Sequence, residues 1–136
     1  MIAALAHINM LVPPNTLHLA EAFYGDTLGL ASRAVPKLQQ DCLRWFDIGA
    51  SGQQVHIAFG PAGEGLSSRH PCFRLESGEA LVELRRRIWE HFEAGGGAAP
   101  MEADRPGDDD SGAKGEEYPS RFFARDYAGN RLEFSL

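Results

Sequence analysis

Alternating apolar and polar residues mark several short strands, and two longer stretches carry apolar residues at helical spacing. Pro13-Pro14 removes backbone donors after the first strand, and Gly29 follows the first helical stretch as a terminator. Asn15 or Thr16 is the expected cap of that helix. In order, the first half predicts a strand over 4–12, a helix to about residue 28, and strands over 32–38, 42–48 and 53–59.

The same order begins again after residues 60–68, which have the composition of a linker. Ser77 is the expected cap of the second helix, whose buried stripe is Leu81, Leu84, Ile88 and Phe92. The acidic stretch 104–117 lacks apolar periodicity and predicts a loop, either a substrate lid or simply solvated. The predicted elements are a strand over 70–75, a helix over 78–93, and strands over 98–103, 121–126 and 131–136.

This repeated element order predicts an α+β fold of two βαβββ modules, one over 1–65 with its linker and one over 66–136. The 136 residues, 43% hydrophobic and 24% charged, suit a globular core. The net charge of −6 disfavours nucleic acid and anionic membranes as partners. Cys42 and Cys72 lie in strand-like runs and are expected to be buried thiols of a reducing compartment. No basic leader or long apolar run occurs, so we expect a cytoplasmic protein.

Four polar residues lie opposite the apolar face of their predicted strands: His7, His56, His70 and Glu133. If those faces contact solvent, this is ordinary amphipathic patterning. If the two sheets curl into a cup, the four side chains meet in one cavity. Imidazoles and a carboxylate together suit Fe, Mn, Ni, Zn or Co as a divalent ion, and a 2-His-1-carboxylate set leaves coordination positions open for a substrate.

Four sequence motifs, in order and spread over nearly the whole chain, resemble the vicinal-oxygen-chelate superfamily. That superfamily includes glyoxalase I, bleomycin resistance proteins and extradiol dioxygenases. No single motif is specific, but the order of all four carries the resemblance. They are HINMLV at 7–12, AFYGDTLG at 22–29, HPCFRL at 70–75 and DYAGNRLE at 126–133.

The resemblance implies a glyoxalase-like cup, usually completed in a homodimer, with metal ligands on the first, fourth, fifth and eighth strands or on a subset of them. His7, His70 and Glu133 match the first-, fifth- and eighth-strand positions. His56 matches the fourth, where glyoxalase I carries a glutamate that is both ligand and base. For His56 the roles of fourth ligand, proton-transfer group and plain pocket residue stay open.

The implied function is a metal-dependent enzyme whose ion chelates vicinal oxygens of a small substrate, as in lyases, isomerases and ring-cleaving dioxygenases. The alternative is a metal-free binding protein of the bleomycin-resistance type. Such proteins typically lack the His/His/Glu set that is present here, which counts against this alternative.

Candidate substrate-binding residues lie on two strands. Arg121, Phe123 and Arg125 alternate on the seventh, where two guanidinium groups would suit an anionic or enolic substrate or would simply be solvated. On the third strand, pseudo-symmetry favours Arg44, together with Phe46, for the cup, with Trp45 as the alternative wall.

Overall fold

The computed structural model describes residues 1–60, 67–113 and 120–136. Two compact units, Met1–Ala62 and Gly63–Leu136, make up the chain, and each is described by itself. Most of the predicted linker, and residues 114–117 of the predicted acidic loop, lie outside the described residues.

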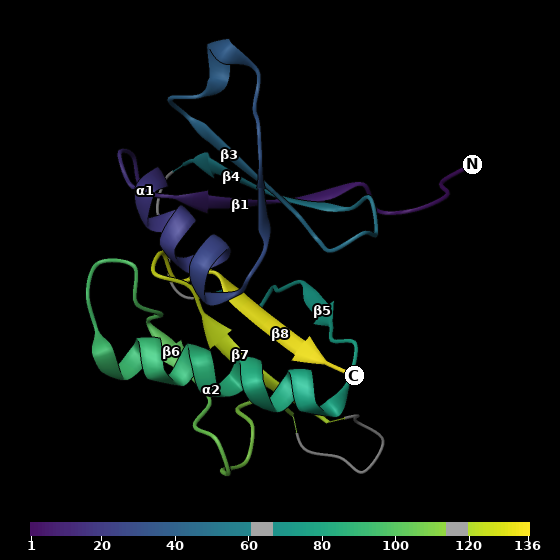
Figure 1. The fold of residues 1–136 in the computed structure, drawn as a ribbon, viewed down its shortest axis with the longest axis vertical. Helices are drawn as coiled ribbons and strands as arrows, with labels where there is room; N and C mark the ends of the chain where they lie inside the picture. The colour runs from purple at the N-terminus through teal and green to yellow at the C-terminus, as the bar shows by residue number, and fades with distance from the viewer. Residues whose placement is uncertain (61–66, 114–119) are drawn as a thin grey trace. The chain divides into compact units, whose positions relative to one another are not determined.

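The first unit has a four-stranded sheet in the order β1-β4-β3-β2 (Figure 1). The central pair β1–β4 is parallel and the others are antiparallel. A short helix runs on without a break into a π-helical turn, η1, between β1 and β2. The elements are β1 (His7–Val12), α1 (Leu17–Ala20), η1 (Glu21–Thr27), β2 (Ala31–Arg33), η2 (Lys37–Gln39), β3 (Leu43–Asp47) and β4 (Gln54–Phe59).

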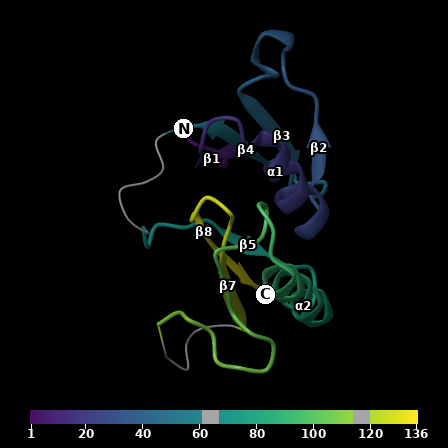
Figure 2. The same cartoon turned by 90° about the vertical axis from the view of Figure 1, so that its left-hand side faces the viewer.

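The second unit repeats this arrangement, with the order β5-β8-β7-β6 and a parallel β5–β8 pair. Its helix α2 contacts β6 and β7, and Figure 2 shows α2 beside the sheet. The elements are β5 (Cys72–Arg74), α2 (Gly78–Ala94), β6 (Glu102–Ala103), β7 (Arg121–Arg125) and β8 (Arg131–Ser135). Both sheets are open, and the predicted α+β class with two βαβββ modules is confirmed.

The two sheets also share their register. In the first unit His56 pairs with Asn9 on β1 and with Trp45 on β3. In the second unit Glu133 pairs with Cys72 on β5 and with Phe123 on β7. Strand positions of one sheet therefore have counterparts in the other, and His56 corresponds to Glu133.

Each core lies between its sheet and its helix, on the face away from the candidate polar residues. Aromatic rings carry much of the packing: Phe23 meets Tyr24 edge-on at 5.2 Å, and Phe122 stacks on Phe134 at 4.8 Å. Burying each such side chain contributes about 1.5–3 kcal/mol. Further fully or nearly fully buried residues are Val12, Ala20, Phe46, Val55, Ile57, Ile88 and Leu132.

Several local predictions are wrong. The strand predicted over 98–103 is only Glu102–Ala103. The strand predicted over 32–38 ends at Arg33, because Pro36 cannot donate to a sheet ladder and instead begins a 3-10 turn. Phe92, predicted in the α2 stripe, is 37% exposed near the end of its helix. The two cysteines, Cys42 and Cys72, are exposed rather than buried.

The helix starts differ in how their backbone groups are satisfied. The Ser77 hydroxyl accepts a hydrogen bond from the Ala80 N–H at 3.1 Å, which confirms the predicted cap. The hydroxyl of Thr16 donates to the Pro13 carbonyl instead, and its side chain makes no cap bond. None of the described helices has the length and apolar content needed to cross a bilayer.

Candidate functional site

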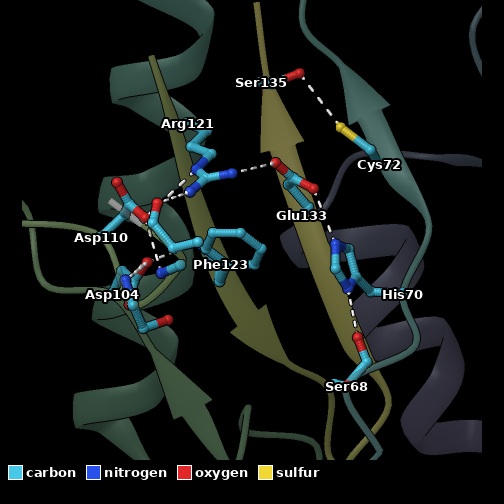
Figure 3. Close-up of polar contacts among 12 residues, drawn as sticks. Ser68, His70, Cys72, Asp104, Asp110, Arg121, Phe123, Glu133 and Ser135 are labelled. Atoms are coloured by element: carbon cyan, nitrogen blue, oxygen red, sulfur yellow. Dashed lines mark hydrogen bonds and ion pairs between the residues drawn. The ribbon is translucent and has the colours of Figure 1, made fainter. Parts of the chain in front are cut away.

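His70 and Glu133 meet on the polar face of the second unit (Figure 3). His70 Nε2 lies 2.9 Å from Glu133 Oε2, and His70 Nδ1 lies 2.7 Å from the Ser68 carbonyl oxygen. A carbonyl oxygen can only accept, so Nδ1 donates to it. The carboxylate also only accepts, so an ion bound at Nε2 would take the place of the hydrogen that Nε2 directs at Glu133. A backbone carbonyl on Nδ1 is also the usual support of a histidine that binds metal through Nε2.

Arg121 and Phe123 of β7 complete this cluster. Arg121 Nη1 lies 3.5 Å from Glu133 Oε1, and the guanidinium carbon lies 5.1 Å from the centre of the Phe123 ring. The Phe123 ring meets His70 edge-on at 5.6 Å. Because the Arg121 side chain is only 8% exposed, its charge acts close to Glu133 with little screening by water.

Hydrogen bonds and an ion pair hold the described part of the acidic loop, 104–113, against the sheet beside Arg121. Asp104 Oδ2 accepts from the Phe123 N–H at 2.8 Å, and Asp110 Oδ1 lies 3.5 Å from Arg121 Nε (Figure 3). The Ala113 carbonyl accepts from Arg121 Nη2. The sequence did not predict the contact of Asp110 with Arg121, because that contact depends on how the loop folds back and no local pattern encodes it.

Arg125, also predicted to line the pocket, is bound elsewhere in its unit. It is 6% exposed, and its Nε donates to Glu102 Oε2 at 3.0 Å. Its Nη1 donates to the carbonyls of Ser67 and Gly129, each at 2.9 Å. The side chain therefore ties the segment that precedes His70 to the turn that precedes β8.

In the first unit, the His56 ring lies between two other rings. Its centre is 4.0 Å from that of His7, with 10° between the planes, and 4.6 Å from that of Trp45, with 12° between the planes. Partial burial lowers the pKa of His56 below the usual value, and the nearby His7 lowers that pKa further. The neutral imidazole is therefore the favoured form of His56.

The preference for Arg44 and Phe46 on the His56 face is wrong. Trp45 is the register partner of His56, so Trp45 lies on that face and Arg44 lies on the other. Arg44 Nε lies 3.2 Å from Glu21 Oε1, and Phe46 is fully buried in the core. The error is a shift of one residue, because the R-x-F pattern of β7 was matched to that of β3.

The matched register gives each candidate residue of one unit a counterpart in the other. His7 corresponds to His70, and Trp45 corresponds to Phe123. Arg121 corresponds to Leu43, so of these two counterpart positions only the one in the second unit carries a cation.

The predicted metal set of His7, His70 and Glu133 takes residues from both units. Within the described ranges, no three His, Cys, Asp or Glu side chains form a group that could hold an ion. The His70–Glu133 pair nonetheless fits two ligand positions. Donors bound about 2.1 Å from one ion stand about 3–3.5 Å apart, close to the 2.9 Å between Nε2 and Oε2.

Solved structures resemble the chain over almost its full length. A glyoxalase family protein from Bacillus anthracis is 23% identical, with a TM-score of 0.69 over 98% of this chain and 94% of that one. The fosfomycin resistance protein FosX from Listeria monocytogenes is 19% identical, with a TM-score of 0.70 over 99% and 91%. The chain has the glyoxalase-like fold.

A third protein of this fold, lactoylglutathione lyase from Agrobacterium tumefaciens, is 20% identical, with a TM-score of 0.62 over 98% and 93% of the two chains. FosX has also been solved with Mn(II) and 1S,2S-dihydroxypropylphosphonic acid. No protein-family profile and no curated protein matches the sequence. The glyoxalase-like fold is thus recognised from structure, and the pattern of motifs in the sequence agrees with it.

Proposed function

We propose that this chain is a metal-dependent enzyme of the vicinal-oxygen-chelate type, with a divalent ion held by His7, His70 and Glu133. The observation that carries the proposal is the 2.9 Å approach of His70 Nε2 to Glu133 Oε2. His7 supports the proposal from the first unit, because it stands at the counterpart position of His70.

When bound, the ion would act as a Lewis acid on two neighbouring oxygens of a small substrate. Fe, Mn, Ni, Zn and Co all suit the donor set, and the Mn(II) in FosX supports an ion of this class. His56 would serve as a fourth ligand or would move a proton to or from the substrate. Its ring is already oriented, because His7 and Trp45 stack on it.

The substrate is proposed to be small and anionic. Arg121 would supply a positive charge beside Glu133, and Phe123 of the second unit and Trp45 of the first would supply apolar walls. The FosX ligand carries two neighbouring hydroxyl groups and a phosphonate, a chemistry that this arrangement of groups would also accept. Lyase, isomerase and dioxygenase reactions all fit such a site. We also propose that the protein is a homodimer, and sedimentation equilibrium would test this by measuring the mass of the assembly.

Metal titration of untagged, metal-stripped protein tests the proposal. We expect about one Mn(II) or Zn(II) per chain, bound at least ~100-fold more weakly by H7A, H70A and E133A. H18A, at an exposed position of α1, is the matched control and should bind as the wild type does. A wild type that binds no ion but takes up small aromatic ligands would contradict the proposal and favour a binding protein.

Activity is tested by comparing metal-loaded with metal-stripped protein on hemithioacetals, catechols and epoxide or diol phosphonates. Turnover that requires the loaded form and is lost in H70A supports an enzyme. Equal rates with and without the ion would contradict the metal-dependent function.

A further inference from the structure

Three polar side chains form a continuous hydrogen-bonded chain in the first unit. Asp47 ends β3 and is the register partner of Gln54, which begins β4. Gln54 Nε2 donates to Asp47 Oδ1 at 2.7 Å, and Gln54 Oε1 lies 2.9 Å from His56 Nε2. Gln54 and His56 are two residues apart on one strand, so they share a face.

The donors and acceptors in this chain can be arranged in only one direction. A carboxylate only accepts, so Asp47 fixes the NH2 of Gln54 on its own side. The amide oxygen of Gln54 then faces His56 and can also only accept. Nε2 of His56 must therefore carry a hydrogen, and the lone pair of the neutral ring is on Nδ1.

Stacking prevents the His56 ring from turning over to exchange its two nitrogens. β4 lies between β1 and β3, so His7 and Trp45 lie on opposite faces of the His56 ring. With both faces covered and one edge bonded to Gln54, the ring is held in one orientation.

We propose that Asp47 and Gln54 are positioning residues that hold His56 as the Nε2–H tautomer, so that Nδ1 is the atom that binds an ion or accepts a proton. The use made of Nδ1 rests on the proposed function, whereas the tautomer is a property of the metal-free chain. We call the hydrogen-bonded chain of Asp47, Gln54 and His56 the relay. The second unit does not repeat it, because Arg125 and Arg131 stand where the first unit has Asp47 and Gln54.

Nuclear magnetic resonance of the 15N-labelled imidazole of His56 tests this in metal-free protein at a pH where the ring is neutral. We expect a single Nε2–H tautomer in the wild type and a mixture of both tautomers in Q54L and D47L. The double variant D47N/Q54E should restore the single tautomer, because the new amide at position 47 then donates to the new carboxylate at position 54, which in turn accepts from Nε2. Q53L, at the neighbouring position of opposite parity, is the control and should match the wild type.

A wild-type ring that carries its hydrogen on Nδ1, or a Q54L ring indistinguishable from the wild type, would overturn the inference. The rescue by D47N/Q54E separates loss of the relay from general damage to the unit. Zn(II) affinity is the second readout, and it should fall about 10- to 100-fold in Q54L and recover in D47N/Q54E. If no variant and no wild type binds Zn(II), the proposed function fails, while the tautomer still decides whether the relay exists.

Discussion

The two units place equivalent residues at the same register positions but hold them by different forces. In the first unit, His56 is stacked between two rings and bonded to the neutral amide of Gln54. In the second, Glu133 lies between the His70 imidazole and the buried Arg121 guanidinium. The fold therefore sets where a side chain stands, and its neighbours decide whether that side chain offers a neutral lone pair or a charge.

Because of this difference, we propose that the two modules have different roles at the site. A neutral imidazole that is already oriented loses little entropy when it binds an ion or takes up a proton. A carboxylate with an arginine beside it supplies negative charge for an ion together with a positive charge for an anionic substrate. Matched substitutions in the two units test this difference.

The largest effect is expected at the turn before β8. Asp126 is fully buried and accepts from the Ala128 and Asn130 N–H groups, each at 2.9 Å, and from the Asn130 side chain at 2.8 Å. D126A should destabilise the protein by about 3 kcal/mol, because three donors lose their acceptor. The counterpart in the first unit is Ile48, where I48A should cost only about 1 kcal/mol. Urea denaturation measures both, and equal losses would contradict the asymmetry between the turns.

The next largest effect is expected on metal affinity, at the counterpart positions Glu133 and His56. E133Q keeps the size of the side chain but removes the charge, so we expect Mn(II) to bind about 100-fold more weakly, a loss of roughly 2.7 kcal/mol. H56Q should weaken binding by only about tenfold, because a neutral donor is lost. Isothermal titration gives both constants. A larger loss of Mn(II) affinity in H56Q than in E133Q would contradict the proposal that the carboxylate of the second unit contributes more to metal binding than His56 does.

A smaller effect is expected where only one unit has a cation. R121L replaces Arg121 by the residue type of its counterpart, Leu43, and should weaken 1S,2S-dihydroxypropylphosphonic acid binding to Mn(II)-loaded protein by about tenfold, through loss of a charge-assisted contact. L43M is the matched control in the first unit and should leave the affinity unchanged. If R121L binds this probe as tightly as the wild type, Arg121 does not contact the anion.

The smallest effect is the response of stability to pH. Burial lowers the pKa of His56 in the first unit and of His91 in the second. As the pH falls through the ordinary pKa of histidine, the unfolded chain binds more protons than the folded chain does. The free energy of unfolding should therefore decrease as the pH drops from about 8 toward about 5.5. H56Q and H91Q should each flatten the fall in melting temperature, and H18Q should not. A melting temperature that rises on acidification in the wild type, or H56Q and H91Q curves as steep as that of the wild type, would contradict the sign.

The alternation of residues was enough to predict the element order and to bring His7 to His56 in one unit and His70 to Glu133 in the other, because the period of a strand fixes which side chains share a face. It was not enough to choose between Arg44 and Trp45, since a shift of one residue exchanges the two faces and only the observed pairing decides it. The contact of Asp110 with Arg121 also escaped prediction, because it joins a loop to a strand.

Part of the relay of Asp47, Gln54 and His56 could have been predicted from the sequence. Asp47 and Gln54 flank a glycine-containing turn, so pairing the hairpin symmetrically about that turn would have placed them opposite each other. The direction of their hydrogen bonds could not be read from the sequence, because it depends on distances between side-chain atoms.

X-ray absorption of protein loaded with one Zn(II) per chain shows directly which side chains bind the ion. We predict at least two imidazoles and one carboxylate at about 2.0–2.2 Å from the ion. H7A and H70A should each lose one imidazole from the spectrum, and E133Q should lose the carboxylate. A spectrum that is the same in all three variants and the wild type would contradict a site built from both units.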